Sequence, residues 1–466
     1  MEGRVVRLAA AGAAAWLCAS GWLRWRRGLR RRRLAQAHSA LLGPARARAA
    51  ADASAPVHQI RRDFFRRWCR RWGLDSARWV HVAGTNGKGS VCSCIHAGLC
   101  ESGVAAGLFT SPHVHVFRER IQVGRERITE TDFLEVWDAC APALASEAWM
   151  VPFDRYLAVA LVHFARRGVQ VVVLETGIGG RFDSTNFVSQ PEVCVLTRIS
   201  HDHVGMLGNR LEDIAWQKAG IMKPRCPVLT TTTQLPEVLR TLEAEAQLVG
   251  CPLTLVESQG PAPGATCRQQ QENAALASAA LRVLGYPGAS MQDAPRFCRF
   301  ERFTFHGPHR SVVLDGAHNP EGLALLLAEV RRLRDPPRRR GSTKEPRLAA
   351  IFGVAQDKDV PAMVSELVNN VHVVYPVQAP GRTALPATEV AALATKHGAG
   401  AVRVDVEARG NPIRAFTTAL ASLPVDGTLV VCGSFYICAA IREEIAKVMP
   451  RAFSKDDPVH ERACWW

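Results

Sequence analysis

A glycine-rich loop between an apolar run and a helical pattern constrains the fold more than any other feature of this sequence. Residues 84–90 read GTNGKGS, after the β-rich run at 79–83 and before a helical pattern over 90–103. Glycines let backbone amides approach phosphate oxygens, and the N-terminus of the following helix adds a positive dipole. The strict P-loop pattern fails, because Val82 replaces its first glycine and Gly89 follows the lysine. The context still favours a phosphate-binding loop over a plain turn. The residues of this loop are Gly84, Thr85, Asn86, Gly87, Lys88, Gly89 and Ser90.

Apolar runs and helical patterns alternate along the chain after this loop. Strands are predicted at 106–109, 169–174, 193–196 and 227–230, and helices at 58–72, 129–141, 154–167 and 210–219. The run at 169–174 is almost continuously apolar, as expected of a strand that is buried on both faces of a parallel sheet. The alternation therefore predicts a doubly wound α/β domain.

A second, smaller α/β domain is predicted after the loop residues 287–290. Its strands are expected at 311–314, 348–352, 371–374 and 428–432, with a helix at 320–333 and a polar loop at 334–345. The predicted organisation is a leader at 1–51, a phosphate-loop domain at 52–295, a C-terminal domain at 296–450 and a disordered tail at 451–466.

Several polar residues follow predicted strands, where side chains of a parallel sheet face a ligand crevice. Glu175 ends the strand at 169–174 and is a candidate Mg²⁺ ligand. His203 follows the strand at 193–196 as part of His-Asp-His, which fits either a metal site or a structural role. Ser111 offers a hydroxyl ligand or belongs to a simple turn. Asp315 begins Asp-Gly-Ala-His-Asn-Pro, which faces the interdomain cleft or merely starts a helix.

The N-terminal segment differs from the rest of the chain. Residues 1–51 contain eleven Arg and a single acidic residue, and residues 8–23 form an apolar run of 16 residues. A run of this length is short for a bilayer span of about 20 residues. The composition fits mitochondrial targeting, with a membrane anchor or a cytoplasmic tail as alternatives. None of this segment is expected to belong to the fold.

Composition excludes several classes of protein. Hydrophobic residues make up 47% of the chain and charged residues 22%, which excludes wholesale disorder and a polytopic membrane protein. The net charge of +15 is concentrated in the leader, so the folded part gives little support for nucleic-acid binding. The 14 Cys lack zinc spacing and are interpreted as reduced thiols.

Seven motifs in order resemble the folylpolyglutamate synthase family of the Mur ligase superfamily. They are HVAGTNGKGS, TSPH, ETGIGGRFDSTN, SHDH, IAWQKAGI, LDGAHNP and VCGSF. The resemblance covers about residues 55–450. It implies a Mur-ligase-like P-loop ATPase domain with a parallel sheet, followed by a smaller Rossmann-like α/β domain. The implied reaction is ATP-dependent addition of L-glutamate to the γ-carboxylate of a folate through an acyl phosphate, with dihydropteroate as a second acceptor.

The resemblance also implies roles for individual residues. It assigns catalysis to Lys88, Lys218, Asp315 and His318, and nucleotide binding to the glycine loop with Asn273, Arg299 and Asp315. It assigns metal binding to Ser111, Glu175, His203 and Lys218. Folate binding is assigned to Asp183. Two Mg²⁺ ions and a carbamylated Lys218 are expected, and the enzyme is expected to act as a monomer without nucleic acid.

Three positions depart from the family pattern. Cys298 replaces a glycine, Gln269-Gln270 lacks a histidine, and Asp154 replaces a glutamate. A competing hypothesis is an inactive adaptor that binds a membrane or nucleic acid through the arginines of residues 24–33. The intact Lys88 and Glu175 argue against it.

Overall fold

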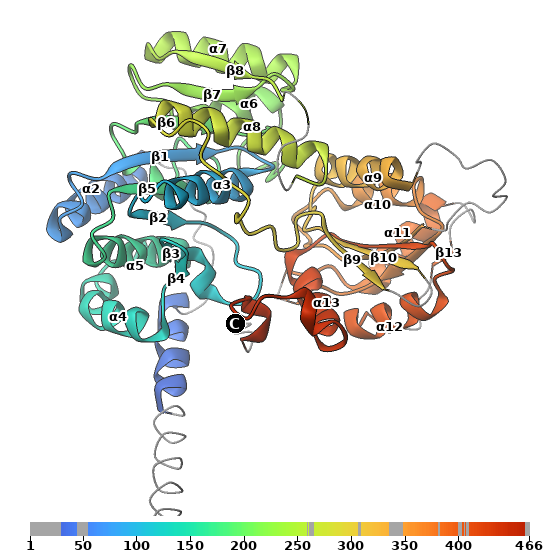
Figure 1. Cartoon of the computed structure of the whole chain (residues 1–466). Helices are drawn as coiled ribbons and strands as arrows, with labels where there is room; N and C mark the ends of the chain where they lie inside the picture. Colours follow the sequence, from blue (N-terminus) through green and yellow to red (C-terminus); the bar gives the residue numbers. More distant parts are fainter. Residues whose placement is uncertain are drawn as a thin grey trace, which may run out of the picture.

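The computed structural model describes residues 29–43, 55–258, 260, 265–305, 309–334, 348–380, 383–398, 403–404, 406 and 410–461. Within these residues the chain forms two α/β domains that lie side by side (Figure 1). This arrangement confirms the predicted fold class.

The N-terminal domain is built on a sheet with strand order β4-β3-β2-β5-β1-β6-β7-β8. Its strands are β1 (Arg78–Ala83), β2 (Ala106–Phe109), β3 (Ile121–Val123), β4 (Glu126–Arg127), β5 (Val171–Glu175), β6 (Val193–Leu196), β7 (Val228–Thr231) and β8 (Leu253–Val256). All neighbouring pairs are parallel except those that involve β3 and β4, which form an antiparallel hairpin at one edge.

Helices cover both faces of this sheet. They are α2 (Ala55–Trp72), α3 (Lys88–Glu101), α4 (Glu130–Ala145), α5 (Pro152–Arg166), α6 (Leu211–Ala219), α7 (Pro236–Val249) and α8 (Arg268–Val283). Alternate residues of β5 enter different cores. Val172 and Leu174 pack in the core formed with α2 and α5, whereas Val171 and Val173 pack in the core formed with α3 and α8. Burial on both faces explains the continuous apolar run of this strand.

The C-terminal domain has a second sheet with strand order β13-β12-β11-β14-β10-β9. Its strands are β9 (Glu301–Phe305), β10 (Arg310–Leu314), β11 (Leu348–Phe352), β12 (Val373–Pro376), β13 (Arg403–Val404) and β14 (Thr428–Cys432). Its helices are α9 (Pro320–Arg334), α10 (Val360–Val368), α11 (Ala387–Gly398), α12 (Pro412–Ser422) and α13 (Phe435–Val448). Among the described strands of this second sheet, only the edge pair β9–β10 is antiparallel. The predicted loop at 334–345 lies almost entirely outside the described residues.

The prediction that residues 1–51 contribute nothing to the fold is wrong for residues 29–42. These residues form a helix, here called the N-terminal helix, which lies beside α4 and α5 (Figure 1). Leu34, Ala37 and Leu41 are buried in the core of the N-terminal domain. Burial of a leucine side chain stabilises a fold by about 1.5–3 kcal/mol, so this helix is part of the domain. Residues 1–28, including the apolar run at 8–23, lie outside the described part of the chain.

The end of the chain also differs from its prediction. Residues 450–461, here called the C-terminal segment, contain two 3₁₀ turns, η3 (Pro450–Ala452) and η4 (Pro458–His460). Phe453 and Val459 pack in the core of the C-terminal domain, so the tail predicted to be disordered is ordered at least as far as residue 461. None of the helices in the described ranges is both long and apolar enough to cross a lipid bilayer.

Candidate active site

A cavity of about 180 Å³ lies where the two domains meet, at the carboxyl ends of β1, β5 and β10. It brings together most of the residues predicted from sequence: Thr85, Asn86, Gly87, Lys88, Gly89, Ser90, Ser111, Glu175, His203, Asn273, Arg299, Asp315 and His318. Strand register explains the convergence. Val82 pairs with Glu175 and Phe109 pairs with Leu174, so the loops after three parallel strands leave the sheet side by side.

The glycine loop has the conformation that its sequence predicts. Gly84 has φ 148° and Gly87 has φ 95°, a backbone region that L-residues rarely adopt. A Cβ atom at Gly87 would collide with the side-chain amide of Asn273. Lys88 opens α3, and its Nζ donates to the carbonyls of Gly84 at 3.0 Å and Thr85 at 3.1 Å. The lysine and the helix N-terminus therefore present positive charge to the same cavity.

Glu175 and Ser111 are joined at the metal-candidate side of the cavity. The backbone amide of Ser111 donates to Glu175 Oε2 at 2.8 Å, and the Glu175 side chain is only 3% exposed. Burial raises the pKa of Glu175, whereas the charges of Lys88 and Arg299 oppose that shift. A divalent cation at this carboxylate would remove the cost of burying it.

The donor set fits Mg²⁺ held jointly with phosphate. Within the described residues there is no group of three or more His, Cys, Asp or Glu side chains that could hold a metal alone. Mg²⁺ commonly binds through one or two carboxylates together with substrate phosphates. Glu175, Ser111 and His203 beside a phosphate loop meet that description.

His203 lies in the loop between β6 and α6. It has φ 51°, a strained value for a residue other than glycine. Burial lowers its pKa to about 4 despite the opposing effect of Asp202, and nearby Lys358, Lys218 and Lys88 lower it as well. The imidazole is therefore neutral at pH 7 and retains a lone pair for a ligand.

Lys218 lies just behind the cavity and does not line it. Its side chain is 4% exposed and its Nζ donates to the carbonyl of Gly84 at 2.8 Å. Burial and then the charge of Lys88 lower the pKa of Lys218 to about 7. The amine therefore has a substantial neutral fraction at physiological pH.

Asp315 and Arg299 form the C-terminal wall of the cavity. Asp315 accepts hydrogen bonds from the amides of Phe300 at 2.7 Å and Ala317 at 2.8 Å, and burial raises its pKa to about 6. The Arg299 guanidinium lies 5.0 Å from the ring centroid of Phe435. Cys298 and Phe300 on either side of Arg299 have φ 52° and 53°, so Cys298 occupies a conformation that favours the glycine of the family pattern.

Gln269 stands where the family pattern has a histidine, and Gln270 keeps the glutamine that follows it. Gln270 Nε2 donates to the backbone carbonyl of Arg299 at 2.7 Å, which ties α8 to the Arg299 turn.

Lys358 is a site residue that sequence reasoning missed. Its Nζ lies 2.6 Å from Asp202 Oδ1, and His318 Nε2 lies 3.7 Å from Asp202 Oδ2. Burial opposes ionisation of Asp202, but the His318 hydrogen bond and the charges of His203, His318 and Lys358 hold its pKa well below the usual range. Lys358 follows β11, so the strand-end argument applied to the second sheet could have found it.

A neighbouring cavity of about 320 Å³ opens at Ser111, Pro112 and Gly177, which it shares with the first. Its wall is largely apolar and aromatic, with Phe153, Ile178, Phe182, Met206 and Leu207, and it also contains Asp154 and Asp183. The Asp183 carboxylate accepts from the amides of Gly177, Ile178 and Thr185 and from the Thr185 hydroxyl. Asp183 therefore shapes the loop that lines this cavity.

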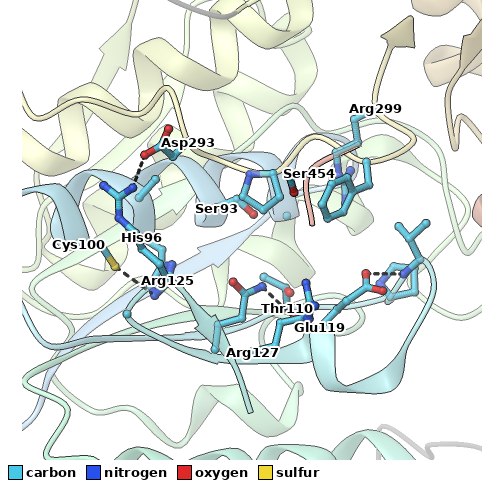
Figure 2. A pocket seen from close by; sticks show the side chains of 18 residues that line it. Ser93, His96, Cys100, Thr110, Glu119, Arg125, Arg127, Asp293, Arg299 and Ser454 are labelled. Carbon is cyan, nitrogen blue, oxygen red and sulfur yellow. Dashed lines mark hydrogen bonds and ion pairs between the residues drawn. The ribbon is translucent and has the colours of Figure 1, made fainter. Parts of the chain in front are cut away.

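A third cavity of about 280 Å³ runs along α3 from Gly89 and Arg299 towards Cys100 (Figure 2). The strand-end loop at Thr110, the hairpin residue Arg127 and Ser454 of the C-terminal segment also line it. The C-terminal segment therefore reaches a cavity that borders the glycine loop.

Comparison with known protein families matches both domains. Residues 82–228 match the Mur ligase middle domain, and residues 298–435 match the Mur ligase glutamate ligase domain.

Individual relatives extend this similarity. The dihydrofolate synthase/folylpolyglutamate synthase of Bacillus subtilis is 33% identical over 336 residues, which cover 64% of this chain and 76% of that protein. The human protein named folylpolyglutamate synthase, mitochondrial, is 36% identical over 218 residues, which cover 44% of this chain and 37% of that protein. The chain thus spans well under half the length of this eukaryotic relative.

A solved structure agrees with the fold across both domains. Escherichia coli FolC in complex with DHPP and ADP has a TM-score of 0.70 and 27% identity, covering 82% of this chain and 92% of that chain.

The geometry predicts that Lys88→Ala weakens nucleotide binding without unfolding the protein. Loss of one charged donor to phosphate should lower affinity for Mg-ATP by about 10- to 100-fold. Titration with a fluorescent ATP analogue measures the affinity, and circular dichroism checks the fold. Lys396→Ala, at an exposed position on α11, is the matched control. Wild-type affinity in the Lys88 variant would contradict the phosphate-loop assignment.

Proposed function

Because this chain belongs to the folylpolyglutamate synthase family, whose members are ligases that form carbon–nitrogen bonds, we propose that it joins L-glutamate to the γ-carboxylate of a folate with ATP. One observation carries this proposal. The phosphate loop of one domain and Asp315 and His318 of the other line one cavity, which adjoins both the aromatic cavity and a cavity lined by Lys358. A nucleotide, an amino acid and a flat aromatic acceptor can therefore meet there.

The reaction is balanced in two steps. A folate carboxylate oxygen attacks the γ-phosphorus of ATP, so ADP leaves and an acyl phosphate forms. The amine nitrogen of glutamate then attacks the acyl carbon, inorganic phosphate leaves, and the amine loses a proton. Both steps move negative charge between oxygens, so the protein contributes mainly by positioning and charge neutralisation.

The phosphate side of the reaction is proposed to depend on the glycine loop. Lys88 would exchange its two loop carbonyls for phosphate oxygens, and Asn273 and Arg299 would contact the nucleotide. Ser111, Glu175 and His203 would hold Mg²⁺, which supplies charge neutralisation for the phosphates when bound. Two ions are proposed, since a carbamylated Lys218 would add two further oxygens.

The amino-acid side is proposed to lie at Asp202, His318 and Lys358. This group combines one carboxylate with two cationic or hydrogen-bonding side chains within 4 Å. A zwitterionic amino acid with a second carboxylate has complementary charges. Lys358 would exchange its contact with Asp202 for one with a carboxylate of the glutamate substrate. Asp202 would then accept hydrogen bonds from the ammonium group of that glutamate.

The folate is proposed to occupy the aromatic cavity. Phe153 and Phe182 offer faces for a bicyclic ring, and the opening at Ser111 and Gly177 leads towards the phosphate site. The same cavity would admit dihydropteroate, so a second, dihydrofolate synthase activity is also proposed. The Bacillus relative carries both names.

An assay of glutamate incorporation tests the proposed reaction. Purified protein with ATP, Mg²⁺ and radiolabelled glutamate should add label to tetrahydrofolate, and addition to dihydropteroate would establish the second activity. Lys88→Ala should abolish incorporation with either acceptor, while Lys396→Ala should not change it. Absence of incorporation by wild-type protein that binds ATP would contradict the function.

The Lys218 carbamate has its own test. A carbamate forms from a neutral amine and CO₂, and the pKa of about 7 provides that amine. Lys218→Ala should reduce turnover by about 10- to 100-fold, and acetate or formate should restore part of it. The exposed Lys447→Ala is the control. Full activity of Lys218→Ala would remove the lysine from the mechanism, and loss without rescue would contradict the carbamate.

Mitochondrial targeting is proposed for the arginine-rich leader, with cytoplasmic protein or a membrane anchor as other outcomes. Human and bovine relatives carry the word mitochondrial in their names. Because residues 29–42 belong to the fold, residues 1–28 alone should direct a fluorescent reporter to mitochondria as well as residues 1–51 do. A diffuse cytosolic reporter in both cases would contradict the proposal. We also propose that the protein is a monomer and acts without nucleic acid. Sedimentation of the purified protein would measure its mass and so check the monomer.

A further inference from the structure

The loop between β2 and β3, residues 110–120, carries the metal-candidate Ser111 and is here called the Ser111 loop. Its neck is closed by the Thr110 amide, which donates to the Arg120 carbonyl at 3.1 Å. Inside the loop, the Glu119 carboxylate accepts from the amides of Val114, His115 and Val116 at 2.9, 2.7 and 2.7 Å. Figure 2 shows Glu119 pointing into this loop. These bonds set the shape of the loop but not its position relative to the domains.

The tip of the Ser111 loop is inserted into the C-terminal domain. Val114 is buried in the core of that domain, although it belongs to the N-terminal half of the chain. His115 is fully buried, with Nε2 3.2 Å from Arg442 Nη1 and Nδ1 3.5 Å from Glu443 Oε1. The loop position therefore depends on α13.

Arg442 is held in turn by the C-terminal segment. Its guanidinium is 2% exposed and makes paired contacts with Asp457 at 2.6 and 2.7 Å and with Glu301 at 2.9 and 3.0 Å. The rings of Phe297 and Phe453 lie 4.4 and 4.9 Å from it. A buried guanidinium that loses one carboxylate is strongly destabilised, so Asp457 is required for this arrangement.

The C-terminal segment also reaches the N-terminal domain directly. Glu461 pairs with Arg118 of the Ser111 loop and lies 2.8 Å from Arg127 of β4. Arg127 Nη2 donates to the Asp456 carbonyl at 3.0 Å. The segment therefore spans from α13 back to the base of the Ser111 loop.

The N-terminal helix contacts the same loop through His38. The His38 ring stacks on Phe117 with centroids 4.2 Å apart, and His38 Nε2 lies 2.6 Å from the Tyr156 hydroxyl. Arg120 lies over the Tyr156 ring at 4.8 Å and donates from Nε to His113 Nδ1 at 2.9 Å. Arg120 also lines the aromatic cavity, so this contact reaches the proposed folate site.

We propose that the N-terminal helix and the C-terminal segment form a clamp that positions the Ser111 loop, with His38 and Asp457 as its positioning residues. The inference rests on the proposed function, since Ser111 and Arg120 border the proposed metal and folate sites. Neither positioning residue lines the nucleotide cavity. Loss of either contact should therefore impair the metal and folate sites while the glycine loop keeps its nucleotide affinity.

Two single variants test the clamp, each with a control from its own segment. Asp457→Asn keeps the side-chain shape but removes the charge. Its control is Asp456→Asn, because the neighbouring Asp456 contacts Arg127 through its backbone carbonyl, which the substitution leaves in place. His38→Ala removes the ring, and Gln36→Ala is an exposed control on the same helix. Both clamp variants should raise the half-activating Mg²⁺ concentration and the KM for folate by about tenfold. The affinity of both clamp variants for ATP should stay within about twofold of wild type. In the control variants, the half-activating Mg²⁺ concentration and the KM for folate should also stay within about twofold of wild type.

Hydrogen exchange gives a readout that is independent of activity. The amides of Val114, His115 and Val116 should exchange faster in both clamp variants, whereas peptides from α3 should exchange as in wild type. Thermal unfolding separates general destabilisation from loop release, and a folded Glu461→Gln variant repeats the test if Asp457→Asn fails to fold. Unchanged loop exchange in folded variants, or an equal rise of KM for ATP and folate, would overturn the clamp. Failure of the proposed function would instead appear as inactive wild-type protein with normally protected loop amides.

Discussion

A charge that is removed from water needs a partner, and in this molecule many of those partners come from the opposite domain. Asp202 of the N-terminal domain faces Lys358 and His318 of the C-terminal domain, and Arg198 pairs with Glu321 on α9 at 2.7 Å. Separation of the domains without a ligand would remove both Lys358 and His318 from the buried Asp202. The relative position of the two sheets, and with it the geometry of the cleft, therefore depends on these paired charges as well as on the insertion of Val114 into the core of the C-terminal domain.

The strand-end motifs were predictable because a parallel sheet leaves little freedom in where its loops emerge. Once β1, β2 and β5 are recognised as neighbours, the glycine loop, Ser111 and Glu175 must lie close together. Lys358 escaped prediction because it follows a strand of the second sheet without a motif to mark it. The roles of Cys298, which departs from the family pattern, and of Gln270 also needed coordinates. The φ of 52° at Cys298 and the 2.7 Å bond from Gln270 Nε2 to the Arg299 carbonyl explain what those residues do.

The two chain ends show where local sequence patterns fail. Leu34, Ala37 and Leu41 have helical spacing, but the preceding arginines dominate the composition and suggest a leader throughout. In the C-terminal segment, Asp456 and Asp457 look equally polar, yet only the Asp457 side chain binds the buried Arg442. The difference depends on a residue on α13 and on two aromatic rings from separate elements. Arg442 and Phe297 lie outside the segment, so a pattern within the segment cannot reveal the role of Asp457.

Asn86 of the phosphate loop has a consequence for how ligands communicate. Its Nδ2 lies 3.2 Å from Glu321 Oε2, and Asn319 Nδ2 donates to its Oδ1 at 3.0 Å, so the loop touches the first turn of α9 directly. A nucleotide that moved Asn86 away from Glu321 and Asn319 would remove contacts between the two domains. Thermodynamic linkage is reciprocal, so an amino acid that favours one orientation alters nucleotide affinity by the same factor. Under the proposed function, the nucleotide and amino-acid sites would thereby be coupled through one amide.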